Sequence, residues 1–154
     1  LGSFSPALRT VVRTLIRVGA AGQYVVGTGP WQGGPAFEGN DLTTDYERFM
    51  ARVAFWGAHP ELAIGGPTYG WVSAALRSIR RLGRRGYLNE LRLPVLMLLG
   101  QDDSVVDNAA AQRVLSTIER GRVQTFAGAR HELLQETDAV RAGVWRTLDA
   151  FFQA

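Results

Sequence analysis

Residues 94–100 read PVLMLLG, a short continuous apolar run that ends in glycine. This pattern is typical of a strand that is buried on both faces of a sheet. Further along the chain, residues 107–118 predict a helix, residues 122–126 predict a second strand and residues 138–152 predict an amphipathic helix. The order strand–helix–strand–helix implies parallel strands joined by right-handed crossovers. The sequence therefore predicts an α/β fold built around these two strands.

The two predicted strands are too few to make a sheet that is stable by itself. Parallel strands buried on both faces need several partners and helices on both sides. The rest of the chain offers at most one further weak strand, at residues 23–26. We therefore expect residues 91–154 to be the C-terminal α/β core segment of a larger fold, most of whose sheet is missing from this chain.

Residues 1–90 show helical periodicity separated by glycine-rich loops. Ser5 and Pro6 predict the start of a first helix, because a hydroxyl cap and a proline in the first turn favour helix initiation. Thr44 and Glu47 have the spacing of a capping box at the start of a second helix. Residues 69–82 predict a third helix. Three amphipathic helices joined by such loops favour a helical cap, or lid, rather than a core.

The composition is that of a globular protein and excludes several classes. The chain has 154 residues, of which 46% are hydrophobic and 20% charged, so it is too apolar to be disordered. No apolar run approaches the roughly 18 residues of a membrane span. Without cysteine there are no disulfides, thiolate metal ligands or cysteine nucleophiles.

Two loops that carry polar side chains follow the two predicted strands. Residues 100–103 (GQDD) follow the first strand and residues 128–131 (GARH) follow the second. Ligands of open parallel sheets bind at the carboxyl ends of the strands, where adjacent strands bring such loops side by side. A carboxylate beside a histidine can fix the imidazole tautomer while the histidine accepts a proton from a hydroxyl nucleophile. The alternative is that Asp102 and Asp103 are turn residues and His131 is a surface loop residue.

The same segments carry a family resemblance. PVLMLLGQDDSVVDN (94–108) and VQTFAGARHELLQE (123–136) resemble the C-terminal end of α/β-hydrolases of the bacterial lysophospholipase and monoacylglycerol lipase group. Residues 36–49 and 59–72 resemble the helical cap of that group. The resemblance implies that Asp103 is the catalytic acid and His131 the base of a serine hydrolase. It also implies a lipid ester substrate, either a lysophospholipid or a monoacylglycerol, and no cofactor.

The nucleophile of that family is absent from the chain. It lies in a G-x-S-x-G turn ahead of the cap, and no such motif occurs here. Residues 66–70 (GPTYG) have a similar shape, but Thr68 is better interpreted as a helix cap because no buried strand precedes it. HELLQE has Gln135 where a zinc helix requires a second histidine, so no metal site is predicted. We expect the N-terminal half of the fold to be missing and this chain alone to be inactive.

The cap offers candidate substrate contacts among its aromatic residues. Trp31, Trp56 and Trp71 are candidates to line an acyl-chain entrance, as a lipid substrate would require. The alternative is that they form the small core of the cap.

The third predicted helix carries a row of arginines on one side. This row consists of Arg77, Arg80, Arg81 and Arg84. It is either a solvated face or a contact for anionic lipid headgroups or a substrate phosphate. Nucleic acid is not expected as a partner, because the chain has 14 acidic residues against 17 arginines and the helix lacks interleaved base-stacking aromatics.

Two other functions remain open from the residues alone. One is a different α/β-hydrolase, such as an esterase or a dehalogenase-like enzyme, because the acid–histidine pair is shared and the nucleophile is unseen. The other is a non-catalytic interaction domain that uses the arginine-rich helix. We expect a cytoplasmic location, with peripheral membrane contact through that helix.

Overall fold

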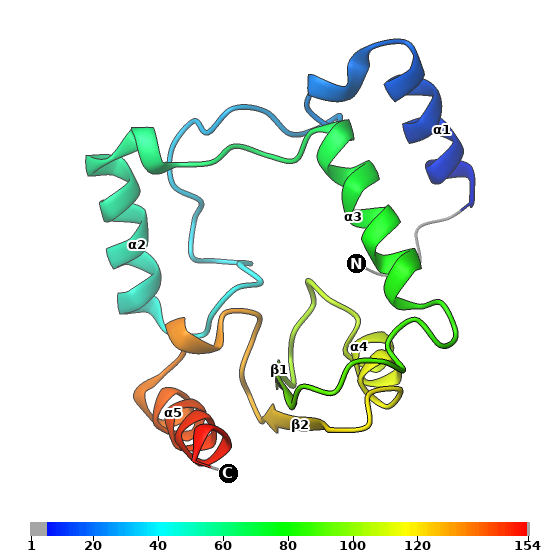
Figure 1. Cartoon of the computed structure of the whole chain (residues 1–154). Coiled ribbons are helices and arrows are strands. Elements are labelled where there is room, and N and C mark those ends of the chain that lie inside the picture. The colour runs from blue at the N-terminus through cyan, green and yellow to red at the C-terminus, as the bar shows by residue number, and fades with distance from the viewer. Residues whose placement is uncertain (1–5, 154) are drawn as a thin grey trace.

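The computed structural model describes residues 6–153, with side chains from residue 10 onward, so the predicted cap at Ser5 lies outside the described residues. The helices and strands follow in the order α1 (Pro6–Arg17), α2 (Tyr46–Ala58), α3 (Tyr69–Leu82), β1 (Val95–Gly100), α4 (Asn108–Leu115), β2 (Gly121–Phe126) and α5 (Asp138–Phe152), with short 3₁₀ turns at Ala20–Gly22, Pro60–Leu62 and Leu133–Gln135. Helix α1 packs beside α3, α2 lies on the other side of the molecule, and α4 and α5 accompany the strands (Figure 1).

The two strands pair in parallel, as the sequence predicts. Val95 lies opposite Gly121 and Gly100 lies opposite Phe126, so both strands end at the same edge of the sheet. Helix α4 forms the crossover. It ends at Leu115, three residues before the predicted Ile118, because the hydroxyls of Ser116 and Thr117 donate to the carbonyls of Arg113 and Val114. Such bonds compete with continuation of the helix.

The expectation of strands buried on both faces is wrong for this chain. Residues 95–98 of β1 are half-buried, residues 122–125 of β2 are exposed, and only Leu99 and Gly100 are buried. Within residues 6–153 the sheet contains only these two strands. With so few strands, the faces of the sheet are left largely open.

The weak strand predicted at residues 23–26 does not form. Tyr24 makes a single antiparallel bridge with Thr68, flanked by a bond from the Val25 N–H to the Pro67 carbonyl. A ladder cannot extend through Pro67, because proline has no N–H to donate. The segment instead fixes the loop before α3.

The second helix begins one residue later than predicted. The Asp45 side chain, rather than that of Thr44, caps α2 by accepting from the Arg48 N–H at 3.0 Å. The Thr44 hydroxyl is engaged elsewhere, because it donates to the carboxylate of Glu136. Helix α3 covers the predicted residues 69–82, and the Thr68 hydroxyl accepts from the Trp71 N–H at 3.2 Å, which confirms its interpretation as a cap.

Candidate active site

The loops that follow β1 and β2 bring one carboxylate and one imidazole together. Nδ1 of His131 lies 2.8 Å from Oδ2 of Asp103. The Asp103 side chain is only 4% exposed, whereas that of His131 is 35% exposed. The pair thus consists of a buried acid and a histidine that solvent can reach, which suits a base that must meet a substrate.

The carboxylate of Asp103 is held in place by backbone N–H groups of residues that follow it in the loop. Its Oδ1 accepts from the N–H groups of Val105 at 2.8 Å and Val106 at 3.1 Å. Burial of the carboxyl raises its pKa, but the hydrogen bonds from His131 and from these two N–H groups outweigh that effect and hold the pKa of Asp103 below its usual value. Asp103 is therefore kept as an anion that can accept from His131.

Asp102 and Asp107, the neighbouring aspartates, have other roles in the structure. The Asp102 side chain is exposed, while its backbone N–H donates to the Ala129 carbonyl at 2.9 Å and joins the two loops. Asp107 caps α4, as predicted, by accepting from the Ala110 N–H at 2.8 Å. The structure therefore pairs Asp103, and not Asp102, with His131.

A segment of the predicted cap, for which the sequence indicated no role in the site, holds both loops. We call residues 40–45 the strap. The Leu42 carbonyl accepts from the Glu132 N–H at 2.8 Å, and the Asn40 carbonyl accepts from the Arg130 guanidinium at 2.6 Å. On the acid loop, the Ser104 hydroxyl donates to the Asp41 carboxylate at 2.6 Å. The strap thus spans the loop of the acid and the loop of the histidine.

An arginine of α2 reaches the same histidine loop. Arg52 forms an ion pair with Glu132, the residue after His131. Its guanidinium carbon lies 5.0 Å from the ring centre of Trp56 and 5.2 Å from that of Phe49, within the range of a cation–π contact. Trp56 is thereby linked through Arg52 to the candidate site.

The other two candidate tryptophans belong to different segments from Trp56. Trp71 lies in the first turn of α3, is 58% exposed and lines a surface groove of about 480 Å³ together with Tyr24 and Ile64. Trp31 is half-buried in the loop before α2, and among the described residues its indole N–H has no hydrogen-bond partner. Helices α2, which carries Trp56, and α3, which carries Trp71, lie on different sides of the molecule, so these two tryptophans do not form one cluster (Figure 1).

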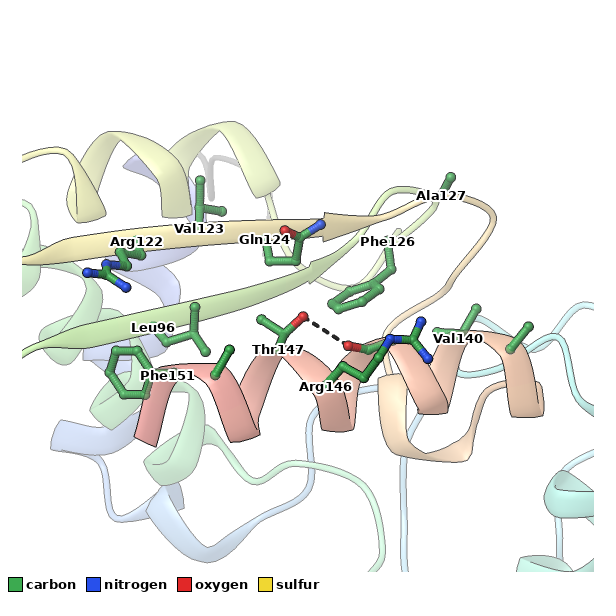
Figure 2. A pocket seen from close by; sticks show the side chains of 13 residues that line it. Leu96, Arg122, Val123, Gln124, Phe126, Ala127, Val140, Arg146, Thr147 and Phe151 are labelled. Atoms are coloured by element: carbon green, nitrogen blue, oxygen red, sulfur yellow. Dashed lines mark hydrogen bonds between the residues drawn. The ribbon is translucent and has the colours of Figure 1, made fainter. Parts of the chain in front are cut away.

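A large cavity lies away from the acid–histidine pair. It measures about 750 Å³ and lies between the sheet and α5, where Leu96, Phe126 and Phe151 face it (Figure 2). Neither Asp103 nor His131 lines it. Small residues of α5, including Gly143, line its other side. Polar side chains line it too, namely Arg122, Gln124, Arg146 and Thr147, so this hollow is a poorly covered face of the sheet with a mixed lining.

The arginine row faces solvent, but only Arg77, Arg80 and Arg81 lie on α3. The helix ends at Leu82 with Gly83 as its C-cap, so the prediction that Arg84 lies on one side of this helix is wrong. The side chains of Arg77, Arg80, Arg81 and Arg84 are all exposed, and a shallow groove of about 160 Å³ runs between them. Within residues 6–153, no three His, Asp or Glu side chains are grouped so that they could hold a metal ion. The same part of the chain has no helix of the length and apolarity needed to cross a membrane.

The sequence matches a known protein family over most of its length. The family model described as serine aminopeptidase, S33, matches residues 3–138. The chain belongs to this family. Lysophospholipase L2 of Escherichia coli is 33% identical over 137 residues, which cover 84% of this chain and 39% of that protein. A Haemophilus influenzae relative also named for lysophospholipase L2 is 29% identical over 147 residues, covering 95% of this chain and 46% of that protein.

Solved structures show the same fold. A soluble variant of monoglyceride lipase from Saccharomyces cerevisiae, in complex with a substrate analogue, superimposes with a TM-score of 0.70 at 16% identity, covering 96% of this chain and 49% of that one. Monoacylglycerol lipase of Paleococcus ferrophilus gives a TM-score of 0.60 at 12% identity, covering 97% and 53%. The chain thus forms part of an α/β-hydrolase fold, and it spans less than half the length of the two curated relatives that it matches.

Proposed function

We propose that this chain is the cap and C-terminal part of a serine hydrolase that cleaves carboxylic esters of lipids, either lysophospholipids or monoacylglycerols. The observation that carries the proposal is the hydrogen bond between Asp103 and His131 at the ends of adjacent parallel strands. The names of the relatives, lysophospholipase L2 and monoglyceride lipase, support the substrate class.

In this mechanism the nucleophile is a serine outside residues 1–154, since the chain contains no G-x-S-x-G motif. His131 accepts the serine proton at Nε2 as the serine oxygen attacks the ester carbonyl, and then donates it to the departing alcohol. A water molecule next gives a proton to His131 and attacks the acyl-enzyme, which releases the fatty acid and restores the serine. Asp103 holds Nδ1–H of His131 and stabilises the imidazolium that forms in each step.

The division of labour along the chain is part of the proposal. Residues 1–90 form the cap and residues 91–154 carry the acid and the histidine. Trp31, Trp56 and Trp71 contact the acyl chain from the cap. The groove beside Trp71 and the link from Trp56 through Arg52 to the histidine loop support this assignment.

We also propose that the protein is cytoplasmic and touches the membrane surface through Arg77, Arg80, Arg81 and Arg84. Four exposed guanidinium groups, three on α3 and one just after its C-cap, attract anionic headgroups. Trp71, which is 58% exposed in the first turn of the same helix, and Ile64, which is 90% exposed in the loop before it, supply apolar contacts.

The proposal is tested by labelling with a fluorophosphonate, which reacts with activated serines. The full-length protein is expected to form a covalent adduct and to hydrolyse monoacylglycerol or lysophospholipid, while the 154-residue chain forms none. His131→Ala in the full-length protein should lower kcat by about 10⁶-fold. Retained hydrolysis in this variant, or an adduct on the isolated chain, would overturn the assignment.

A further inference from the structure

One buried carboxylate lies directly behind the histidine loop. Glu136 is 0% exposed, and both of its carboxylate oxygens accept hydrogen bonds. Oε1 accepts from the backbone N–H of Arg130 at 2.8 Å and of Thr44 at 3.1 Å, and Oε2 accepts from the Thr44 hydroxyl. Burying a carboxylate is costly unless it is hydrogen-bonded, so these donors account for its presence in the interior.

Glu136 is connected to His131 through the main chain, because it accepts a hydrogen bond from the residue before His131. The peptide N–H on one side of His131, that of Arg130, donates to Glu136, and the N–H on the other side, that of Glu132, donates to the Leu42 carbonyl at 2.8 Å. The backbone of His131 is therefore held at both of its neighbours.

We propose that Glu136 is a positioning residue for His131. By fixing the amide of Arg130, its carboxylate aims Nδ1–H of His131 at Asp103 and leaves Nε2 for the nucleophile. Glu136 does not touch the substrate and acts only through His131. The inference rests on the proposed role of His131 as the base.

The strap is also attached to the histidine loop by hydrogen bonds that do not use Glu136, so a positioning role of Glu136 can be distinguished from mere attachment of the strap. The Thr43 hydroxyl donates to the Gln135 carbonyl at 2.7 Å, and the Arg130 guanidinium donates to the Asn40 carbonyl at 2.6 Å. These bonds do not involve the Glu136 side chain. Loss of that carboxylate should therefore leave the strap attached while it frees the Arg130 amide.

Kinetics of the full-length protein test the proposal. Glu136→Ala should lower kcat by about 100-fold with little change in KM, because a misplaced catalytic group slows the chemical step more than it weakens binding. Glu136→Gln should recover most of this loss, since its amide oxygen can still accept from the Arg130 N–H. Thr44→Val, which leaves that bond in place, should remain near wild type. If Glu136→Ala fails to fold, Glu136→Asp, one methylene shorter, replaces it with the same expectation.

A matched loss of stability provides the control. Leu115→Ala removes a buried side chain in α4, away from the histidine loop, and should lower stability without lowering kcat of the folded enzyme. A similar fall of kcat in Leu115→Ala would overturn the proposal, because it would mean that Glu136 acts only through stability. An equal fall of kcat in Thr44→Val would also overturn it, because it would mean that Glu136 acts only by attaching the strap.

An NMR measurement tests the role of Glu136 even if the protein does not hydrolyse esters. The Nδ1–H proton of His131 is expected as a downfield NMR resonance that is absent in His131→Ala. It should move upfield or broaden in Glu136→Ala and stay unchanged in Leu115→Ala. Absence of ester hydrolysis in the wild type would refute the proposed function alone. An unchanged resonance in Glu136→Ala would refute the role of Glu136.

Discussion

At the scale of single residues, the site depends on a contrast between a buried acid and an accessible histidine. Asp103 receives hydrogen bonds from two backbone N–H groups and from His131, so its orientation is fixed before any substrate arrives. His131, which is 35% exposed on its side chain, remains available to a reacting hydroxyl. This arrangement lets the acid act on the histidine while solvent is excluded from the acid.

The first prediction concerns the titration of Asp103. Its pKa lies below the ordinary value of 3.8, and His131→Ala should raise it, because the variant removes a hydrogen bond and leaves the effect of burial. Since the folded-state pKa is lowered, the stability that Asp103 contributes is present above pH 3.8. It is lost as the pH falls through the folded-state pKa. The measurement is an NMR titration of the aspartate carboxyl carbons.

Asp45 is the internal control for that titration. Its pKa is also lowered, mainly by the backbone N–H of Arg48, which is independent of His131. The pKa of Asp45 should therefore be the same in the wild type and in His131→Ala. If the pKa of Asp103 were also unchanged in His131→Ala, the bond between the two side chains would not exist in solution.

A second prediction distinguishes the two adjacent aspartates. Asp103→Asn in the full-length protein should lower kcat by about 10⁴-fold, because the amide stabilises the wrong imidazole tautomer. Asp102→Asn should leave kcat near that of the wild type, since the Asp102 side chain is exposed and only its backbone joins the loops. The reverse order, measured as kcat on the same ester, would show that the acid is Asp102.

The pair could be predicted from the sequence, whereas the residues behind it could not. The rule that parallel strands end at one edge places the loops at 100–103 and 128–131 side by side, and the family resemblance then selects Asp103 over Asp102 as the acid and His131 as the base. Glu136 and the strap make contacts across 92 positions of sequence, and no local pattern encodes such a separation. The asparagine- and aspartate-rich strap predicts a turn, but not its partner.

At the scale of elements, the two loops meet because a glycine ends β1. A Cβ built at Gly100 would lie 2.1 Å from the carbonyl oxygen of Arg130 and 2.6 Å from that of Ala129. Both atoms belong to the backbone of the histidine loop, so a side chain cannot be accommodated by rotation alone. The glycine thus permits the close approach of the acid strand and the histidine loop.

The third prediction follows from this approach. Gly100→Ala should destabilise the full-length protein by about 1–3 kcal/mol and also lower kcat, because the histidine loop must shift. Gly57→Ala is the control, since a Cβ at that position would meet nothing within 4 Å and alanine favours a helix interior by up to about 1 kcal/mol. Urea unfolding and ester hydrolysis measure the two effects. Equal stability of both variants would contradict the close contact.

The arginine row yields a fourth prediction. Replacing Arg77, Arg80, Arg81 and Arg84 by glutamine should weaken binding to vesicles that contain phosphatidylglycerol, by about 1 kcal/mol for each arginine near the surface. Binding to neutral phosphatidylcholine vesicles should change little. Four other exposed arginines serve as a control with the same change in charge, namely Arg113, Arg120, Arg122 and Arg146. Equal loss in both sets would indicate net charge rather than a membrane-facing helix.

Element boundaries show where local patterns compete with distant contacts. The spacing of Thr44 and Glu47 is a genuine capping pattern, yet Asp45 caps α2 because Glu136 takes the Thr44 hydroxyl. Helix α3, whose cap at Thr68 has no such competitor, has the predicted bounds. A boundary is thus predictable where its capping group has no partner from another part of the chain.

At the scale of the whole molecule, the chain exposes more surface than a compact protein of its mass. Its accessible surface is 10385 Å², whereas a folded monomer of 16.8 kDa exposes about 7,700 Å². The excess includes large apolar side chains such as Val123, at 45% exposed, and the open hollow beside α5. The apolar pattern of β1 predicts a strand that is buried on both faces, but a sheet of two strands cannot bury both of its faces.

The final prediction concerns this excess. The isolated 154-residue chain should bind the dye ANS, because apolar sheet surface remains open, and should unfold in urea with a low m-value for its length, because it buries little surface on folding. The full-length protein should bind little ANS and show a steeper transition, since further strands and helices would cover the sheet. The two measurements are made side by side at equal molar concentration. A cooperative transition of ordinary steepness without ANS binding would mean that the 154 residues complete their own core, in which case the partial-sheet interpretation would be wrong even if Asp103 and His131 are catalytic.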